Sequence, residues 1–132
     1  MESLVTLEEV REFFRKDHFA TANGAVVDEV SDKHAVCSLE IGEGHRNAFG
    51  GVMGGVPFML ADFAFAVATN HQGSIVVSLS SNISFLGVAK GKRLIAEAKC
   101  IKDGRSTCCY IIDVKDELDN MVAAVTINGF KK

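Results

Sequence analysis

The stretch Gly54–Asn70, GGVPFMLADFAFAVATN, decides how the rest of the chain can fold. Its pattern predicts a helix over about 54–70, and Pro57 falls in the first turn, where a missing N–H costs nothing. Large apolar side chains cover most of the circumference of this helix, with alanines between them. A helix that is apolar all round has to be buried on most sides. The remaining chain must therefore supply a sheet that covers it.

The segments on either side of this helix alternate apolar and polar residues, which is typical of strands. The strand patterns cover residues 25–30, 35–41, 75–85, 93–101, 106–116 and 121–130. The first two are joined by a turn and are expected to form a hairpin. An amphipathic helix over about 6–18, with Thr6 and Glu9 as a capping box, precedes them. This order predicts an α+β fold, an antiparallel sheet around a long central helix, in one domain spanning 1–132.

The strand pattern over 75–85 is the longest alternating segment before the final hairpins. Apolar residues occupy the odd-numbered positions 75, 77, 79, 83 and 85, as Ile75, Val77, Leu79, Ile83 and Phe85, and they alternate with Ser78, Ser80, Asn82 and Ser84. Strict alternation places the two sets on opposite faces of the sheet. We therefore expect a half-buried strand with one apolar and one polar face.

Composition excludes several classes of function. A net charge of −3 over 132 residues removes the broad basic field with which nucleic-acid binders and proteins of anionic membranes attract their ligands. Asp62 interrupts the apolar stretch that could otherwise suggest a membrane span. The N-terminus lacks the features of a secretory signal. Four histidines without ligand spacing predict no metal site. The thiols, expected to be buried in a reducing cytoplasm, are Cys37, Cys100, Cys108 and Cys109.

Asp62 is the only ionisable side chain between Arg46 and His71. Burial in an apolar helix raises the pKa of a carboxyl group, which suits a general base or a nucleophile. The alternative interpretation is structural: a helix aspartate that points into a small wet gap or pairs with an arginine elsewhere.

A glycine-rich segment, Gly50–Gly55, leads into the same helix. Free backbone N–H groups at a helix start can bind an anion or a developing oxyanion, although the glycines could also serve a tight turn with positive φ. Asp62 lies eight residues beyond Gly54, which is roughly 12 Å along a helix axis. One carbonyl cannot contact both groups on a single helix. If both serve one reaction, a second copy must supply the carboxylate across a twofold axis, which predicts at least a dimer.

The segment Asn47–Asn70, NAFGGVMGGVPFMLADFAFAVATN, resembles a known family. It is similar to the pattern N-x-x-G-x-x-H-G-G-x-x-F-x-L-A-D-x-A-F-A-x-A-x-N of the hotdog-fold acyl-CoA thioesterases, in the PaaI-like branch of phenylacetic acid degradation. The resemblance implies hydrolysis of an acyl-CoA, with an aromatic or medium-chain acyl group as candidates. No cofactor is implied, because coenzyme A is part of the substrate.

The same resemblance implies roles for four residues. Asp62 would be the general base or nucleophile, and the Gly54 N–H would hold the oxyanion. Asn47 would position the water or the carbonyl, and Ser78 would assist near the aspartate. The family site is shared between subunits, which implies a homodimer and, by extension, a homotetramer.

One position departs from the family pattern, because Met53 stands where the family has histidine. A thioether cannot donate a hydrogen bond, so catalysis is expected to be weakened or altered. His45 could take over the role of the family histidine. The alternative is that His45 is simply a histidine of a surface loop. The departure leaves open a non-catalytic acyl-CoA binding protein, or another hotdog chemistry such as a dehydratase. The residues expected to contact substrate or the phosphates of coenzyme A are Met53, Gly55, Phe58, Lys90, Arg93 and Arg105.

Overall fold

The computed structural model describes residues 6–132. Its elements are α1 (Leu7–Phe14), α2 (His18–Ala22), β1 (Val26–Ser31), β2 (His34–Glu40), the 3-10 turn η1 (Glu43–His45), α3 (Gly55–Asn70), β3 (Val76–Phe85), β4 (Arg93–Asp103), β5 (Thr107–Asp116) and β6 (Met121–Lys131). None of the helices within residues 6–132 combines the length and apolar character that crossing a membrane requires.

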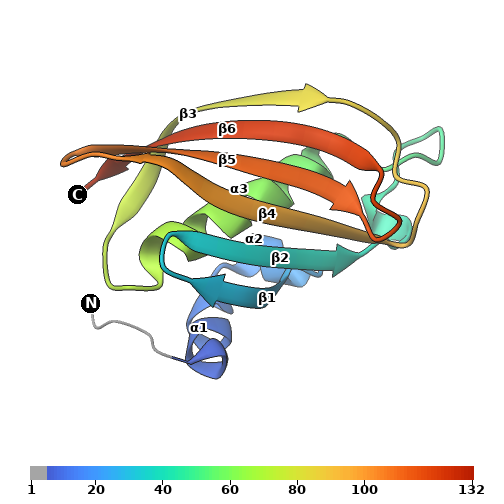
Figure 1. Ribbon diagram of the computed structural model, residues 1–132. Coiled ribbons are helices and arrows are strands. Elements are labelled where there is room, and N and C mark those ends of the chain that lie inside the picture. The colour runs from blue at the N-terminus through green and yellow to red at the C-terminus, as the bar shows by residue number, and fades with distance from the viewer. Residues whose placement is uncertain (1–5) are drawn as a thin grey trace.

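The six strands form one antiparallel sheet in the order β1-β2-β4-β5-β6-β3. The sheet curves around α3, and α1 and α2 lie near the β1 edge (Figure 1). The first two strands form the expected hairpin, closed by a tight turn in which Lys33 has a φ of 57°. The predicted α+β architecture, an antiparallel sheet wrapped around a long helix, is confirmed.

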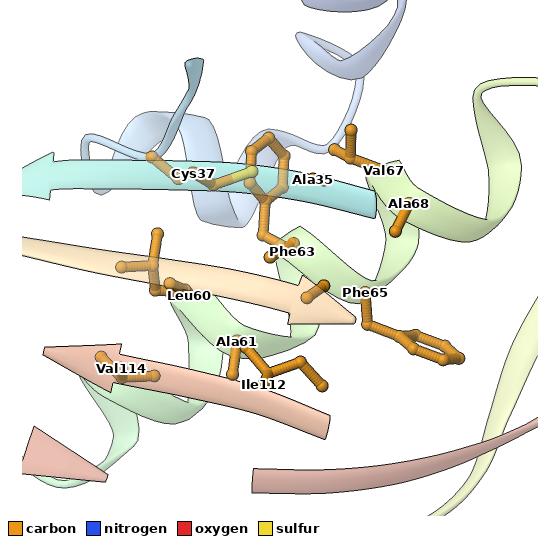
Figure 2. Close-up of a cluster of buried hydrophobic side chains, with 14 of the residues drawn as sticks. Ala35, Cys37, Leu60, Ala61, Phe63, Phe65, Val67, Ala68, Ile112 and Val114 are labelled. Atoms are coloured by element: carbon orange, nitrogen blue, oxygen red, sulfur yellow. The ribbon is translucent and has the colours of Figure 1, made fainter. Parts of the chain in front are cut away.

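The core forms where α3 packs against the concave face of the sheet. Figure 2 shows Phe63 pointing toward Cys37 of β2, whereas Phe65 points away from it. Phe65 meets Tyr110 of β5 edge to face, with ring centroids 5.5 Å apart. Gly129 of β6 lies close against the Phe65 ring, because a Cβ there would lie 2.8 Å from it. The helix is thus held on its sheet side by large rings in fixed orientations.

The N-terminal helix differs from the expectation of one helix over 6–18. The chain forms two helices, α1 and α2, with a break over residues 15–17. Thr6 caps α1 as expected, since its hydroxyl accepts a hydrogen bond from the Glu9 N–H at 3.1 Å. The helix ends after Phe14, which packs edge to face on Phe63, because the following residues are polar and give α1 no further apolar face to bury.

Strand β3 also differs from its expected form. Between Ser78 and Ser80 the pairing with β6 shifts by one residue, so Leu79 forms a bulge that reverses the alternation. Beyond the bulge, Ile83 and Phe85 pair with buried β6 residues and face the helix, whereas Val77 before it faces outward. The prediction of a single apolar face was therefore wrong. Because β3 is an edge strand, nearly all of it is exposed.

Candidate active site

The loop between η1 and α3 is held in shape by Asn47. Its Oδ1 accepts hydrogen bonds from the Phe49 N–H at 3.0 Å and the Gly51 N–H at 3.1 Å. Gly50 adopts a φ of 86°, a conformation that favours glycine. These contacts fix the loop that delivers the chain to Gly54. The Asn47 Nδ2 has no acceptor within residues 6–132, so it remains available to a ligand.

Gly54 is the N-cap of α3, and its backbone N–H has no hydrogen-bond acceptor among the described residues. The ring of Phe85 lies directly beside it, since a Cβ on Gly54 would be 3.0 Å from Phe85 Cζ. Asn47 and Gly54 line one cavity of about 330 Å³, which we name the loop cavity. Its walls are Asn47, Gly51, Val52, Gly54, Pro57, Phe85, Gly87, Val88, Ala89 and Val122. The structure thus brings these two predicted site residues together.

Asp62 does not lie in the loop cavity. It belongs to a stripe of α3, with the half-buried Met59 and Ala66, that the sheet leaves partly uncovered, and Asp62 is exposed in the single chain. The expectation that Asp62 is buried within one chain was therefore wrong, because the sheet covers only one side of the helix. Neighbouring atoms still remove part of its hydration. This desolvation, followed by repulsion from the Asp17 carboxylate, raises the pKa of Asp62 above its usual range.

Ser78 lies in β3 directly opposite Gly129, on the side of the sheet that faces α3. Gly129 packs against Phe65, which is three residues beyond Asp62 in the same helix. The alternating pattern placed Ser78 on one polar face together with Ser80, Asn82 and Ser84. That placement was wrong, because the bulge at Leu79 separates Ser78 from the polar residues that follow it.

Met53 and Gly55 contact each other across the helix start, because a Cβ on Gly55 would lie 2.7 Å from the Met53 methyl carbon. Both residues line a second cavity, of about 310 Å³, which we name the α2 cavity. Its walls are Phe19, Asn23, Gly44, His45, Met53, Gly55, Val56 and Met59. Phe58, also expected at the substrate, is half-buried against the core and lines neither cavity.

His45 cannot replace the missing family histidine in this conformation. Its Nδ1 accepts a hydrogen bond from the Gly42 N–H at 2.9 Å, and its Nε2 lies 2.7 Å from the Asn23 carbonyl oxygen. The first bond leaves Nδ1 unprotonated, so Nε2 carries the hydrogen and donates it. Both nitrogens are therefore engaged with the backbone, and His45 ties η1 to the end of α2.

The basic residues expected at the phosphates of coenzyme A do not form one cluster. Lys90 is exposed beside the loop cavity, at the end of the sheet where α3 begins. Arg93 is engaged by Asp28 at 3.2 Å and by the Ser38 hydroxyl at 2.7 Å. Arg105 lies beyond the opposite end of β4, roughly 30 Å away for a strand of this length. The turns that carry these residues are neighbours in sequence but are separated by the full length of β4.

The sequence did not single out Asp116, the residue that shapes the loop carrying Lys90. Asp116 is buried at the end of β5, and its carboxylate accepts from the N–H groups of Lys90 at 2.8 Å and Gly91 at 3.0 Å. The period of two in β5 could have revealed it, because Asp116 follows Ile112 and Val114 on the inward face. The neighbouring Glu117 carboxylate fills the space where any side chain on Gly91 would project.

An antiparallel sheet wrapped around one long helix, with open backbone N–H groups where that helix begins, is the hotdog arrangement. The model of the thioesterase superfamily matches residues 49–123. Acyl-coenzyme A thioesterase PaaI of Escherichia coli K12 is 32% identical over 112 residues, covering 83% of this chain and 79% of that protein. The chain therefore belongs to the thioesterase superfamily, as a PaaI-like hotdog thioester hydrolase.

Solved structures agree with this assignment. The structure of the E. coli PaaI protein superposes with a TM-score of 0.86 at 27% identity, covering 92% of this chain and 88% of that one. A protein of Streptococcus mutans UA159, solved bound to acetyl CoA, has a TM-score of 0.75 at 26% identity. It covers 80% of this chain and 86% of its own. The recognised family resemblance is confirmed.

Proposed function

We propose that this protein hydrolyses an acyl-CoA to a free acid and coenzyme A. The observation that carries the proposal is that α3 bears both groups the reaction needs. These are the Gly54 N–H, which has no acceptor among the described residues, and the Asp62 carboxylate, whose pKa is raised. An oxyanion needs a fixed donor, and water needs a base whose pKa lies closer to neutrality than that of an ordinary carboxylate. The names of the PaaI relative and of the acetyl-CoA-bound neighbour support this substrate class.

The reaction divides into two steps. The Asp62 carboxylate takes a proton from water while the water oxygen bonds to the thioester carbonyl carbon. The carbonyl electrons move onto oxygen, where the Gly54 N–H and the positive end of the α3 dipole stabilise the charge. The tetrahedral species then breaks its C–S bond, and the departing thiolate takes the proton from Asp62. If Asp62 acts instead as nucleophile, its carboxylate bonds to the carbonyl carbon and the C–S bond breaks, which releases coenzyme A as the thiolate and leaves a mixed anhydride. Water then cleaves this anhydride to the free acid and restores the Asp62 carboxylate, and the proton that water loses goes to the thiolate.

One chain supplies only half of this site. The separation of roughly 12 Å between Gly54 and Asp62 along α3 means that the carboxylate at a given Gly54 comes from the partner subunit. Two features support a twofold pair: α3 leaves the stripe containing Asp62 uncovered, and β3 exposes an edge with apolar side chains. Val77 and Leu79 are 39% and 61% exposed, which is costly for an edge strand that stays in water. A tetramer remains a prediction.

We assign the coenzyme A arm of the substrate to the loop cavity. Asn47 offers its free Nδ2 at the wall of this cavity, and Lys90 lies at its rim next to Ala89. Lys92 is exposed on the same loop and adds a second positive charge for the phosphates. Arg93 is held by Asp28 and so contributes less readily. Arg105 can reach coenzyme A only if it comes from another subunit.

The decisive experiment measures thiol release from a panel of aromatic, short and long acyl-CoAs. Wild-type protein should release free coenzyme A, and Asp62→Asn should lower kcat by about 10² to 10⁴, the usual contribution of a general base. Asp113→Asn, which changes an outward carboxylate of β5, is the matched control and should leave kcat unaltered. Equal activity of Asp62→Asn and wild type would contradict the proposed role of this residue.

A second candidate is a non-catalytic acyl-CoA binding protein. Met53 favours it, because this side chain covers the helix start where the family has a hydrogen-bond donor. Binding of acyl-CoA without thiol release above background would support this alternative. Hydrolysis that Asp62→Asn abolishes would exclude it. Activity toward a 3-hydroxyacyl thioester would instead indicate dehydratase chemistry.

We further propose that residues 1–132 act as one hotdog unit in a reducing compartment such as the cytoplasm. All four cysteines are free thiols, and Cys37 and Cys108 are buried. Burial raises the pKa of the Cys108 thiol, which keeps it protonated and unreactive.

A further inference from the structure

Gly54 lies at the junction of two cavities. Gly54 itself lines the loop cavity, whereas its neighbours Met53 and Gly55 line the α2 cavity. A thioester has two arms, an acyl group and a thiol, which leave the carbonyl carbon in different directions. A carbonyl held by the Gly54 N–H therefore has one cavity available for each arm. The loop cavity adjoins Lys90 and suits the charged coenzyme A arm, which leaves the α2 cavity for the acyl arm.

The α2 cavity has the size and the walls of an acyl pocket. At about 310 Å³ it is at the small end of small-molecule pockets, large enough for an acyl group but not for a whole acyl-CoA. Phe19, Met53, Val56 and Met59 are the large apolar residues of its walls. Methionine side chains are flexible and adapt to ligands of different shape. Phe19 of α2 is 73% exposed and lines the cavity.

Most polar side-chain groups of this wall are engaged with the protein itself. Both ring nitrogens of His45 bind backbone groups. The Asn23 carbonyl accepts from His45, and its Nδ2 donates to the Phe19 carbonyl at 2.8 Å. A hydroxyl group on a bound acyl chain would lose its hydration and find only the Asn23 Oδ1 without a donor among the described residues, which makes its burial unfavourable over most of the wall. The walls therefore favour an acyl group without polar substituents.

We propose that the α2 cavity is the acyl pocket and that it selects unsubstituted aliphatic acyl groups of short to medium length. Phe19, Met53 and Met59 are the specificity-determining residues. This inference rests on the proposed function, because it assumes that Gly54 holds the thioester carbonyl. It adds that selectivity for the acyl group resides in the same subunit as Gly54, on α2 and around the start of α3.

The test compares kcat/KM over acyl-CoAs from two to twelve carbons for wild type, Phe19→Ala and Phe19→Trp. Phe19 is exposed, so neither substitution disturbs the core. Removing the ring should move the optimum to longer chains, and enlarging it should move the optimum to shorter ones, each changing the ratio of medium to acetyl substrate by about 10-fold. A terminal hydroxyl on the best substrate should lower kcat/KM by about 10-fold or more in wild type.

Two control variants test whether the shift in chain-length optimum arises in the α2 cavity. Val88→Ala trims the loop cavity and Ile101→Ala trims an exposed apolar residue of β4, and both should keep the wild-type chain-length optimum. An optimum that moves with Val88→Ala and stays fixed in both Phe19 variants would overturn the assignment.

Binding of S-alkyl-CoA thioethers of the same lengths separates this inference from the proposed function. These analogues cannot be hydrolysed, so they report the pocket even if wild type releases no thiol. Affinity that depends on alkyl length and responds to the Phe19 variants would support the acyl pocket in a binding protein. Affinity that is equal for all lengths would overturn it, whatever the outcome of the hydrolysis assay.

Discussion

Asp62 is exposed to solvent in the single chain, yet desolvation and the nearby Asp17 carboxylate raise its pKa. A base must be deprotonated to act, so kcat/KM should fall as the pH is lowered through this raised pKa. The inflection should lie above the value of about 3.9 that an unperturbed aspartate shows. A pH–rate profile measures it, and an acid limb at or below that value would contradict the electrostatic argument.

The same raised pKa has a consequence for stability. Between the unfolded and folded pKa values the folded chain binds more protons, so this group contributes less stability as the pH rises through that window. Asp62→Asn removes the penalty and should raise the Tm at pH 7 while activity is lost. The gain should shrink toward zero below about pH 4, where the carboxyl is protonated in both states. Thermal unfolding at the two pH values checks this sign, and a lower Tm at pH 7 would contradict it.

The contribution of Asp116 to stability should depend on pH with the opposite sign to that of Asp62. Burial alone would raise its pKa, but hydrogen bonds from the Asn120 side chain and from the backbone N–H groups of Asn120, Lys90 and Gly91 outweigh burial and hold its pKa well below the usual range. Its stabilising contribution is therefore present above about pH 4 and is lost as the pH falls through the folded pKa.

Asp116→Asn replaces an acceptor with a donor that faces other donors. We expect the Tm at pH 7 to fall by about 5 °C or more, with a smaller deficit in acid. Asp113→Asn on the same strand should have little effect, because its closest ion pair is the partly exposed 3.9 Å contact with Lys99. Equal Tm values for both variants would mean that the hydrogen bonds of Asp116 add nothing to stability.

At the scale of elements, β6 and α3 pack tightly where Gly129 faces Phe65. A Cβ on Gly129 would lie 2.8 Å from the Phe65 ring and from Val76, and 3.0 Å from the Cys108 sulfur. Gly129→Ala should therefore force the strand away from the helix and cost about 1–3 kcal/mol, as overpacking does. Denaturant unfolding measures the change. Gly42→Ala is the control, since nothing lies within 4 Å of a Cβ there, and it should be close to neutral.

The sequence could predict α3 because its signal is local. Pro57 marks the first turn, and apolar side chains on all sides require cover. It could not predict that the sheet covers only one side, since the exposure of Asp62 depends on how far the strands curve. The bulge at Leu79 could not be predicted either, because one extra residue in β3 has no local signature. The bulge nevertheless reverses which face of the sheet every later side chain of β3 occupies.

At the scale of the whole molecule, the positions of the basic residues depend on the arrangement of the strands. Lys90 and Arg105 are only fifteen residues apart in sequence and were both expected at the phosphates of coenzyme A, but β4 extends between them and carries them to opposite ends of the sheet. Strand direction and length set this separation, and neither can be read from the composition of the turns. The distance between Gly54 and Asp62, in contrast, could be predicted from the sequence, because both residues lie on one helix with a fixed rise per residue.

That spacing leads to a prediction for the assembled protein. Gly54→Pro removes the N–H donor at a residue whose φ of −57° proline can adopt, and Asp62→Asn removes the base. Each variant alone should be nearly inactive. In a mixed dimer, one site combines both defects, whereas the other combines an intact Gly54 with an intact Asp62 of the partner subunit. Random mixing yields about half mixed dimers, so activity should recover to about a quarter of the wild-type level.

Gly54→Ala keeps the N–H and should retain more activity than Gly54→Pro. Mixtures no more active than the separate variants, after subunit exchange is verified, would place both groups of a site on one chain.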